Sequence, residues 1–351
     1  MPIDEPAERP IMTVVLGAGA SRDVSYAYQL DNYTPSPLDT DFFNILQRID
    51  AKDKDRDAVN KVLKAVRALP YDCWRSLERA FYTLHLRAVM EEELSDALPT
   101  GKDRRVVEQF TRCLQAVLRE AHGSKFCQHH QELFTKLGNR DAIISFNYDL
   151  VAERALCNRA HNLKQPDSFG RWVYGLGPDA KPTGLDMPVL LKLHGSSNWQ
   201  IDSGEIQIKT ASWEAMFAHP GYGASSANYS DPSSYPIILP YWEKPIEQRP
   251  WVDLWRLARK QLQETDYLLV WGYSLPDTDV KTRHLFSIAL AERKKPLHLC
   301  VIDPSAETQR RWRELFREAK YWEFDSFVGF DNRPPEWWVN RAEITHTMQA
   351  S

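Results

Sequence analysis

The chain has 351 residues, of which 43% are hydrophobic and 26% are charged, and its formal net charge is -4. This length suits one large or two smaller domains with a sizeable core. The acidic balance argues against a general nucleic-acid binder, which would carry a basic excess, so we expect no direct nucleic-acid binding.

Targeting, membrane and zinc-binding patterns are not recognisable in the sequence. Residues 1–10 are acidic and contain prolines, unlike a signal peptide. No apolar run reaches the roughly 18 residues needed to cross a bilayer. The five cysteines are scattered and form no C-x-x-C pair: Cys73, Cys113, Cys127, Cys157 and Cys300. We therefore expect a protein of the reducing cytoplasm, with no metal and no membrane contact.

The first predicted strand, Met12 to Gly17, is a short apolar run that leads into Gly-Ala-Gly-Ala-Ser. Gly17 and Gly19 would let the backbone turn tightly and approach a pyrophosphate, and the helix start that follows would offer free N–H groups. Ser21 would add a hydroxyl donor. The usual third glycine of a dinucleotide fingerprint is missing, which argues against an ordinary dehydrogenase site, and no Gly-Lys-Ser/Thr follows, which excludes a Walker A loop. A plain strand-to-loop turn is the alternative.

A long helical stretch comes next. From Asp41 to about Gly123, apolar residues recur at three-to-four spacing in several segments. This is more helix than one crossover between strands needs. We therefore predict a helical insertion or subdomain over about residues 41–135.

Strands and helices alternate in the rest of the chain. Further strands are predicted over Asp141 to Asp149, Pro188 to Ser196, Tyr267 to Leu275 and Pro296 to Pro304, and the alternation in residues 201–209 indicates a hairpin. This order predicts an α/β fold with a Rossmann-like parallel sheet covered by helices. Residues 1–320 would form this domain, and residues 321–351 an aromatic tail that is docked or lies at an interface.

Polar residues stand where each predicted strand ends. In a parallel sheet these ends meet at one edge, where ligands bind. Asn147 and Asp149 follow the second strand: one of them could cap the next helix, and an amide could position a water or bind a ribose. His194 directly follows the third strand, where it could act as a general base or bind a ribose hydroxyl.

The last two strand ends complete this edge. Gly272 to Ser274 could form an ordinary turn, or could complete a phosphate cradle with the first loop. Asp303 could accept hydrogen bonds from an adenosine ribose, and capping of the following helix is the slightly favoured alternative.

Three other groups of residues have non-functional explanations. Arg310, Arg311 and Arg313 lie in a helical stretch that is rich in glutamate, as on a solvated helix face. His129 and His130 are adjacent, which is not ligand spacing on a helix, and we expect them at the surface. The aromatic residues near the C-terminus should lie in the core and at a subunit interface, which favours a homo-oligomer: Trp312, Tyr321, Trp322, Trp337 and Trp338.

Taken together, these motifs resemble the sirtuin superfamily. The loop Gly17-Ala18-Gly19-Ala20-Ser21 is similar to the sirtuin Gly-Ala-Gly-x-Ser loop, and Ser145 to Asp149 to the Gln-Asn-x-Asp segment. Leu193-His194-Gly195 matches the His-Gly of the catalytic histidine, and Gly272-Tyr273-Ser274 matches Gly-Thr-Ser. The resemblance implies catalytic roles for Asn147 and His194. It implies NAD contacts for the loop Gly17 to Ser21 and for Asp149, Gly272, Ser274 and Asp303.

The departures from the deacylase pattern indicate a subclass. The two cysteine pairs of the deacylase zinc module are missing, and so is the Pro-Asp-Phe-Arg run after the first loop. The large helical block and the wording FNYD, KLHGSSNW and GYSLPDTD resemble the bacterial sirtuin-like NAD hydrolases of antiphage defence. This implies NAD as a substrate that is cleaved, and a separate sensor such as a HerA-like ATPase as partner. A protein deacylase and a non-catalytic NAD or ADP-ribose sensor are the alternatives.

Overall fold

The computed structural model describes residues 9–340, with gaps at 29–32, 51–52, 71, 95–101, 124, 163–170, 177–185, 203–204, 209–248, 250 and 294. Its centre is a six-stranded sheet with the strand order β3-β2-β1-β6-β7-β8. Every neighbouring pair in it is parallel. The strands are β1 (Met12–Leu16), β2 (Ala142–Ser145), β3 (Val189–Lys192), β6 (Tyr267–Trp271), β7 (His298–Ile302) and β8 (Lys320–Phe324). The predicted Rossmann-like α/β fold is confirmed.

Two smaller strand features refine the prediction. The hairpin is confirmed: β4 (Trp199–Asp202) pairs antiparallel with β5 (Glu205–Ile208). The strand β8 extends the sheet beyond β7, the last strand that the sequence predicts. Its sequence, KYWEF, lacks an apolar run because an edge strand is only partly buried, so periodicity does not reveal it.

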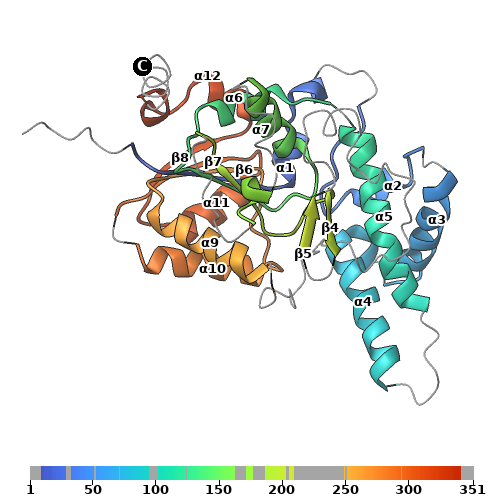
Figure 1. The fold of residues 1–351 in the computed structure, drawn as a ribbon. Helices are drawn as coiled ribbons and strands as arrows, with labels where there is room; N and C mark the ends of the chain where they lie inside the picture. The colour runs from blue at the N-terminus through green and yellow to red at the C-terminus, as the bar shows by residue number, and fades with distance from the viewer. Residues whose placement is uncertain are drawn as a thin grey trace, which may run out of the picture.

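Helices cover both faces of the sheet. In Figure 1, α6 (Gln128–Thr135), α7 (Val151–Asn162) and α12 (Phe327–Asn332) lie above it. On the other face lie α9 (Trp251–Glu264), α10 (Val280–Ala291) and α11 (Ala306–Leu315). Because both faces are covered, the inner strands are apolar along their length rather than alternating. β1 and β2 are buried at every position.

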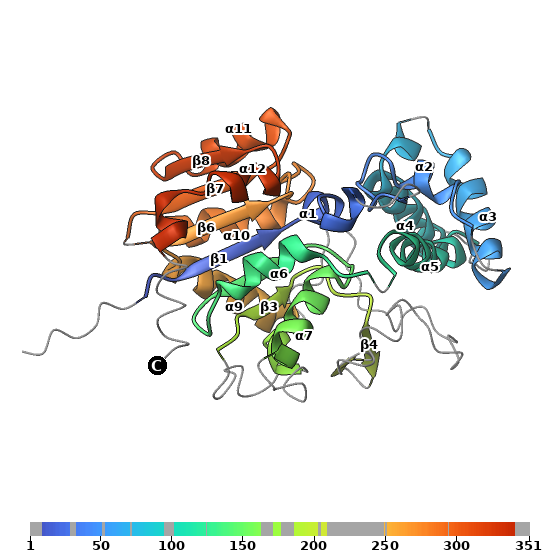
Figure 2. The same cartoon turned by 90° about the horizontal axis from the view of Figure 1, so that it is seen from above.

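Within the predicted insertion of residues 41–135, α6 lies on the sheet, and the helices before α6 form a bundle beside the sheet, which we call the helical subdomain. It consists of α2 (Phe42–Leu46), α3 (Asp53–Arg67), α4 (Leu77–Leu94) and α5 (Lys102–His122). Figure 2 shows it beyond the short helix α1 (Ala18–Arg22), at the end where β1 points. Buried residues recur along α5 at three-to-four spacing, for example Phe110, Leu114 and Val117. The subdomain therefore stands next to the carboxyl ends of the strands.

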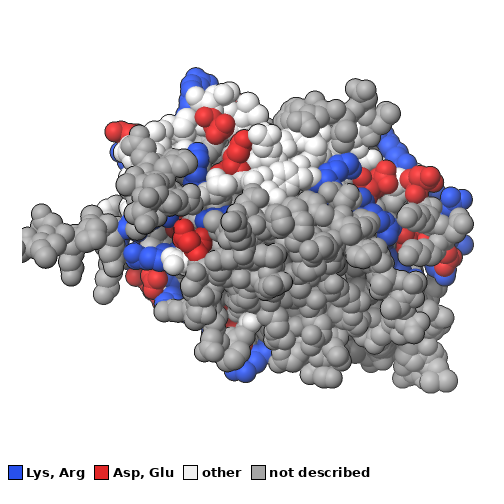
Figure 3. Space-filling view, turned by 45° about the horizontal axis from the view of Figure 1, so that its top comes forward, with Lys and Arg blue, Asp and Glu red and all other residues white. Residues whose placement is uncertain are grey.

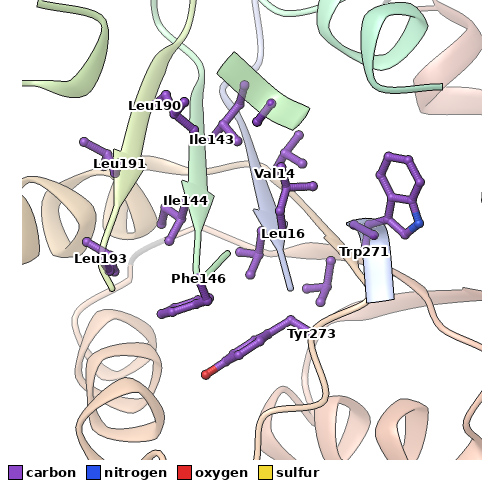
Figure 4. Close-up of a cluster of buried hydrophobic side chains, with 14 of the residues drawn as sticks. Val14, Leu16, Ile143, Ile144, Phe146, Leu190, Leu191, Leu193, Trp271 and Tyr273 are labelled. Carbon is purple, nitrogen blue, oxygen red and sulfur yellow. The ribbon is translucent and has the colours of Figure 1, made fainter. Parts of the chain in front are cut away.

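The main core lies between the sheet and its helices. Figure 4 shows side chains of four neighbouring strands and of the turns that follow them, among them Val14, Ile143 and Leu190. The aromatic C-terminal part joins this core: Trp312 and Trp338 are buried, and the Phe330 and Trp338 rings lie 5.3 Å apart. The core part of the expectation for these residues is confirmed.

Charged side chains of both signs are interspersed over the described residues in Figure 3. Arg310 pairs with Glu307 and Glu314 on the exposed side of α11, which confirms the predicted solvated face. Among the helices that the structure describes, none is long and apolar enough to cross a membrane.

The expectation that His130 lies at the surface is wrong. His130 is 1% exposed, its ring lies 4.4 Å from that of Trp271, and its Nδ1 is 3.1 Å from Cys127 Sγ. Burial lowers its pKa to about 3. The adjacent-histidine pattern misled because α6 packs on the sheet, so one of two neighbouring side chains points inward.

Candidate active site

A cavity of about 1280 Å³ opens at the carboxyl ends of the strands. One wall consists of the turns after β1, β2, β3, β6 and β7, and the other includes residues 36–40 and 75–79 beside and within the helical subdomain. The strand order reverses between β1 and β6, where ligands bind in open α/β sheets. The predicted convergence of the strand ends is therefore present, and it faces a cavity.

The turns after β1 and β6 are packed directly against each other. Gly17 N donates to Trp271 O at 3.0 Å, and Gly19 N donates to Gly272 O at 2.9 Å. A Cβ on Gly17 would lie 2.4 Å from Gly272 O, and a Cβ on Gly272 would lie 2.0 Å from Ala20 N. Gly272 also has φ +64°, which favours glycine. These glycines are thus required by the close approach of two backbones.

The same contacts correct the expectation of free N–H groups at the first loop. Gly17 N and Gly19 N donate to β6 and its turn, and Ala20 N donates to Gly17 O at 2.9 Å. These three amides are already used within the protein. Of the loop, Ala18 and Gly19 line the cavity, while Ala20 and Ser21 are buried behind them.

Asn147 is fixed by this loop. Its Nδ2 donates to Gly17 O at 2.8 Å and to Ser21 Oγ at 2.8 Å. Because both bonds come from the NH₂ group, the Oδ1 atom remains as the hydrogen-bond acceptor of the amide. Asn147 lines the cavity and is 7% exposed. The side chain is therefore held in one orientation at the cavity wall.

Asp149 connects Asn147 to the start of α7. Ser21 Oγ donates to Asp149 Oδ2 at 2.5 Å, and Val151 N donates to Oδ1 at 2.9 Å. Asp149 thus accepts a hydrogen bond at the start of α7, and Asn147 does not. Helix capping therefore accounts for Asp149 but not for Asn147. Burial raises the pKa of Asp149, but His122, the Lys192 ammonium and these two hydrogen bonds together lower it more, and the pKa lies below its usual range.

A buried ion pair lies next to the backbone of Asp149. Lys192 Nζ lies 2.9 Å from Glu153 Oε1 and donates to the Asp149 carbonyl oxygen at 2.6 Å. Neither side chain of the pair is exposed. Ser196 Oγ also donates to Glu153, at 3.0 Å. Burial raises the pKa of Glu153, and Lys192 opposes this rise.

His194 stands at the cavity wall between aromatic rings. It follows β3 and is 3% exposed, and its ring centroid lies 5.0 Å from that of Phe146 and 6.2 Å from that of Tyr148. Its Nε2 lies 3.3 Å from Oδ2 of Asp279. Asp279 is the N-cap of α10 and accepts from Thr282 N. A histidine and a carboxylate thus come together from strands on opposite sides of β1.

The predicted residues of the last two strand ends also line the cavity. Gly272 and Ser274 belong to the turn after β6, and Asp303 follows β7. The interpretation of Asp303 as the helix cap is wrong, because the N-cap of α11 is Ser305. Asp303 instead accepts from Ser305 N at 2.9 Å. Burial raises the pKa of Asp303, and that hydrogen bond opposes the rise.

Sequence reasoning missed three residues of this region. Lys192 carries a charge within an apolar strand, which is a signal for a buried partner. Glu153 shows no such signal, because a glutamate in an amphipathic helix is ordinary. Asp279 precedes a helix and would be assigned as a cap. Its second contact, to His194, depends on the tertiary arrangement.

The cysteines and metal-binding residue types show no cluster in the described part of the chain. All five cysteines are free and buried, as expected for small apolar side chains. No group of three or more His, Cys, Asp or Glu side chains is arranged to hold a metal among the residues that the structure describes.

Among solved structures, a Sir2 homologue in complex with NAD is 11% identical over 95% of this chain and 90% of its own, with a TM-score of 0.36. A Sir2 enzyme is 12% identical over 86% of this chain and 100% of its own, also with a TM-score of 0.36. A Sir2 structure with the inhibitor EX-527, 2'-O-acetyl-ADP-ribose and a deacetylated p53 peptide is 11% identical over 98% and 95%, with a TM-score of 0.34.

Comparison with curated proteins found no match. The model of a SIR2-like domain matches residues 141–324, which is just over half of the chain. This region runs from the start of β2 to the end of β8 and includes Asn147, His194, Asp279 and Asp303. The chain therefore belongs to the SIR2-like domain family.

Proposed function

We propose that this chain is an NAD hydrolase that cleaves the nicotinamide–ribose bond and releases nicotinamide and ADP-ribose. One observation carries the proposal: Asn147 and His194 line the same cavity, at neighbouring strand ends, beside the two glycine turns of a Rossmann-like sheet. An uncharged amide held as an acceptor and a titratable imidazole are the groups that activation of water requires.

The cavity suits a dinucleotide. It spans the point where the strand order reverses, which is the usual dinucleotide site of this architecture. We assign the pyrophosphate to the turns Gly17 to Ser21 and Gly272 to Ser274, with Ala18, Gly19 and Ser274 on the cavity side. We assign one ribose to Asp303, whose carboxylate would accept from a hydroxyl.

The chemistry follows from the leaving group. The C–N bond to the pyridinium breaks, nicotinamide leaves with the electron pair, and the ribose becomes oxocarbenium-like. Asn147 Oδ1 accepts a hydrogen bond from the attacking water, and His194 takes its proton or holds the ribose hydroxyls. Asp149 acts through Ser21 to keep Asn147 in place. The reaction needs no metal, because the departing ring already carries a positive charge.

We propose that this activity depletes NAD in the cell during antiphage defence. The motifs FNYD, KLHGSSNW and GYSLPDTD support this role through their resemblance to defence NAD hydrolases. A HerA-like ATPase or another sensor protein would then supply the trigger, and the chain would act as a homo-oligomer in the cytoplasm.

The test separates the three candidate activities. NAD is incubated with the purified protein, alone and with a HerA-like ATPase, in the presence and absence of an acyl-lysine peptide. A hydrolase releases nicotinamide and ADP-ribose without the peptide. Release that requires the peptide identifies a deacylase. NAD that binds in calorimetry but stays intact in every arm identifies a sensor and contradicts the proposal.

A further inference from the structure

The carboxylate of Asp279 lies directly beside the imidazole of His194. Oδ2 is 3.3 Å from His194 Nε2, and the two side chains are 0% and 4% exposed. Asp279 comes from the loop after β6 and His194 from the end of β3, so the contact crosses the strand-end wall of the cavity. The function proposed above uses His194 and leaves Asp279 without a role.

Helix capping explains only part of this arrangement. Asp279 Oδ1 accepts from Thr282 N at 3.2 Å, which is the capping bond of α10. The other oxygen, Oδ2, accepts from the Tyr273 hydroxyl at 2.8 Å and faces His194. A cap on an exposed helix start needs neither contact. A fully buried carboxylate is costly unless charged or polar groups surround it, and a protonated His194 would supply a compensating positive charge.

We infer that Asp279 is a positioning residue for His194: it fixes the ring with Nε2–H toward the carboxylate and stabilises the imidazolium. With the proton on Nε2, Nδ1 is the basic nitrogen of the neutral ring. The carboxylate then balances the charge that appears when the ring takes a proton from water, as in other His–Asp pairs. This inference rests on the proposed function, because it assigns His194 a proton to take.

Neighbouring groups hold His194 and Asp279 in place. The capping bond ties Asp279 to α10, and the Tyr273 ring stacks on that of Phe146 at 4.2 Å. Burial raises the pKa of Tyr273 well above its usual value, and the Asp279 charge adds to the rise, so the hydroxyl keeps its proton and donates. Tyr148 stacks on His194, and Glu78 of the helical subdomain also faces Tyr273 electrostatically. Tyr148, Tyr273 and Glu78 are thus titratable groups near the pair.

The test is Asp279→Asn. The amide oxygen can still accept from Thr282 N, so the α10 cap and the fold remain, but the negative charge facing His194 is lost. We expect kcat for NAD cleavage to fall by about 10-fold to 1000-fold with little change in KM. In the free protein, the pKa of His194 measured by NMR should fall by about 1 to 3. Asp253→Asn, on the outer side of α9, is the matched control and should leave both unchanged.

Tyr273→Phe should change the pKa of His194 in the opposite direction. It removes one donor from Oδ2 and leaves the ring, so the carboxylate holds the imidazolium more strongly and the pKa of His194 should rise. If neither variant moves the His194 titration, or if Asp279→Asn retains wild-type kcat, the inference is overturned. If the titration responds while wild-type protein leaves NAD intact, the pairing stands and the proposed function fails.

Discussion

The two halves of the strand-end wall are built differently. After β2 and β3, side chains form the wall: Asn147 and His194 are buried polar groups, each oriented by specific partners. After β1 and β6, backbone forms it, with Gly17 and Gly272 so close that no side chain fits between them. The first half supplies functional groups and the second half supplies shape. Substitutions at Asn147 or His194 should therefore impair chemistry, and substitutions at Gly17 or Gly272 should impair folding.

The largest effect is expected at Asn147. Asn147→Asp keeps the size but replaces both Nδ2 donors with a carboxylate that faces Gly17 O and cannot donate to Ser21. We expect nicotinamide release to fall at least about 100-fold. A loss of about 1 to 3 kcal/mol in unfolding free energy should accompany it, from the unsatisfied buried partners. Urea unfolding and product chromatography measure the two. An active, equally stable variant would show that the amide orientation has no role.

In the backbone half, Gly272→Ala tests shape alone. The new Cβ would meet Ala20 N, and alanine at φ +64° is strained. We expect a loss of at least about 3 kcal/mol in unfolding free energy, measured by urea titration. Gly329→Ala is the matched control, because its Cβ would meet only Ser326 Oγ at 3.5 Å. Equal stability of both variants would contradict the close packing of the turns.

Acid should destabilise the folded protein through two buried histidines. Burial lowers the pKa of His122 to about 4 and that of His130, which packs on Trp271, to about 3. A histidine in the unfolded chain titrates near 6.5. Between these values the unfolded chain binds protons that the folded chain does not, so stability falls as the pH falls below about 6.5. At pH 5 each of the two histidines should lower the unfolding free energy by about 2 kcal/mol relative to pH 8.

His130→Phe isolates one of the two contributions. Phenylalanine keeps an aromatic ring against Trp271 but cannot titrate. Urea unfolding at pH 8 and pH 5 should show a loss of stability about 2 kcal/mol smaller than that of the wild type. A variant that loses as much stability as the wild type would mean that His130 is not buried in its neutral form.

The smallest effect is expected where the strand-end wall meets the helical subdomain. Thr278 Oγ1 donates to Glu78 Oε2 at 2.6 Å, next to Asp279. Thr278→Val should cost about 1 kcal/mol of unfolding free energy. Thr278→Ser keeps the hydroxyl and should be nearly neutral. If the valine variant is as stable as the serine variant, this contact does not tie the subdomain to the wall.

The sequence predicted the sheet, the helical subdomain and the hairpin, because apolar periodicity reports directly on burial. It also indicated the strand-end residues, because parallel strands bring their carboxyl ends to one edge. It did not reveal β8, whose half-buried edge position leaves no apolar run. Nor did it reveal the contact between His194 and Asp279, because these residues are far apart in the sequence and only the order of the strands in the sheet brings them together.

The roles of the loop residues also depended on the tertiary structure. From sequence, Ser21 is a donor for a phosphate, but its hydroxyl proton goes to Asp149 and its oxygen accepts from Asn147. Hydrogen-bond partners of this kind come from segments more than 120 residues away, and no local pattern encodes them. The glycines, too, are explained by contact between two turns.

NAD hydrolysis by Asn147 and His194 is tested most directly by nicotinamide release from NAD, without an acyl-lysine peptide, with the wild type, Asn147→Ala and His194→Ala. It is run with each protein alone and with a HerA-like ATPase, and circular dichroism confirms that all three are folded. We predict equimolar nicotinamide and ADP-ribose from the wild type and loss of both products in each variant. Intact NAD with the wild type in both arms, or equal release by the variants, would contradict NAD hydrolysis by Asn147 and His194.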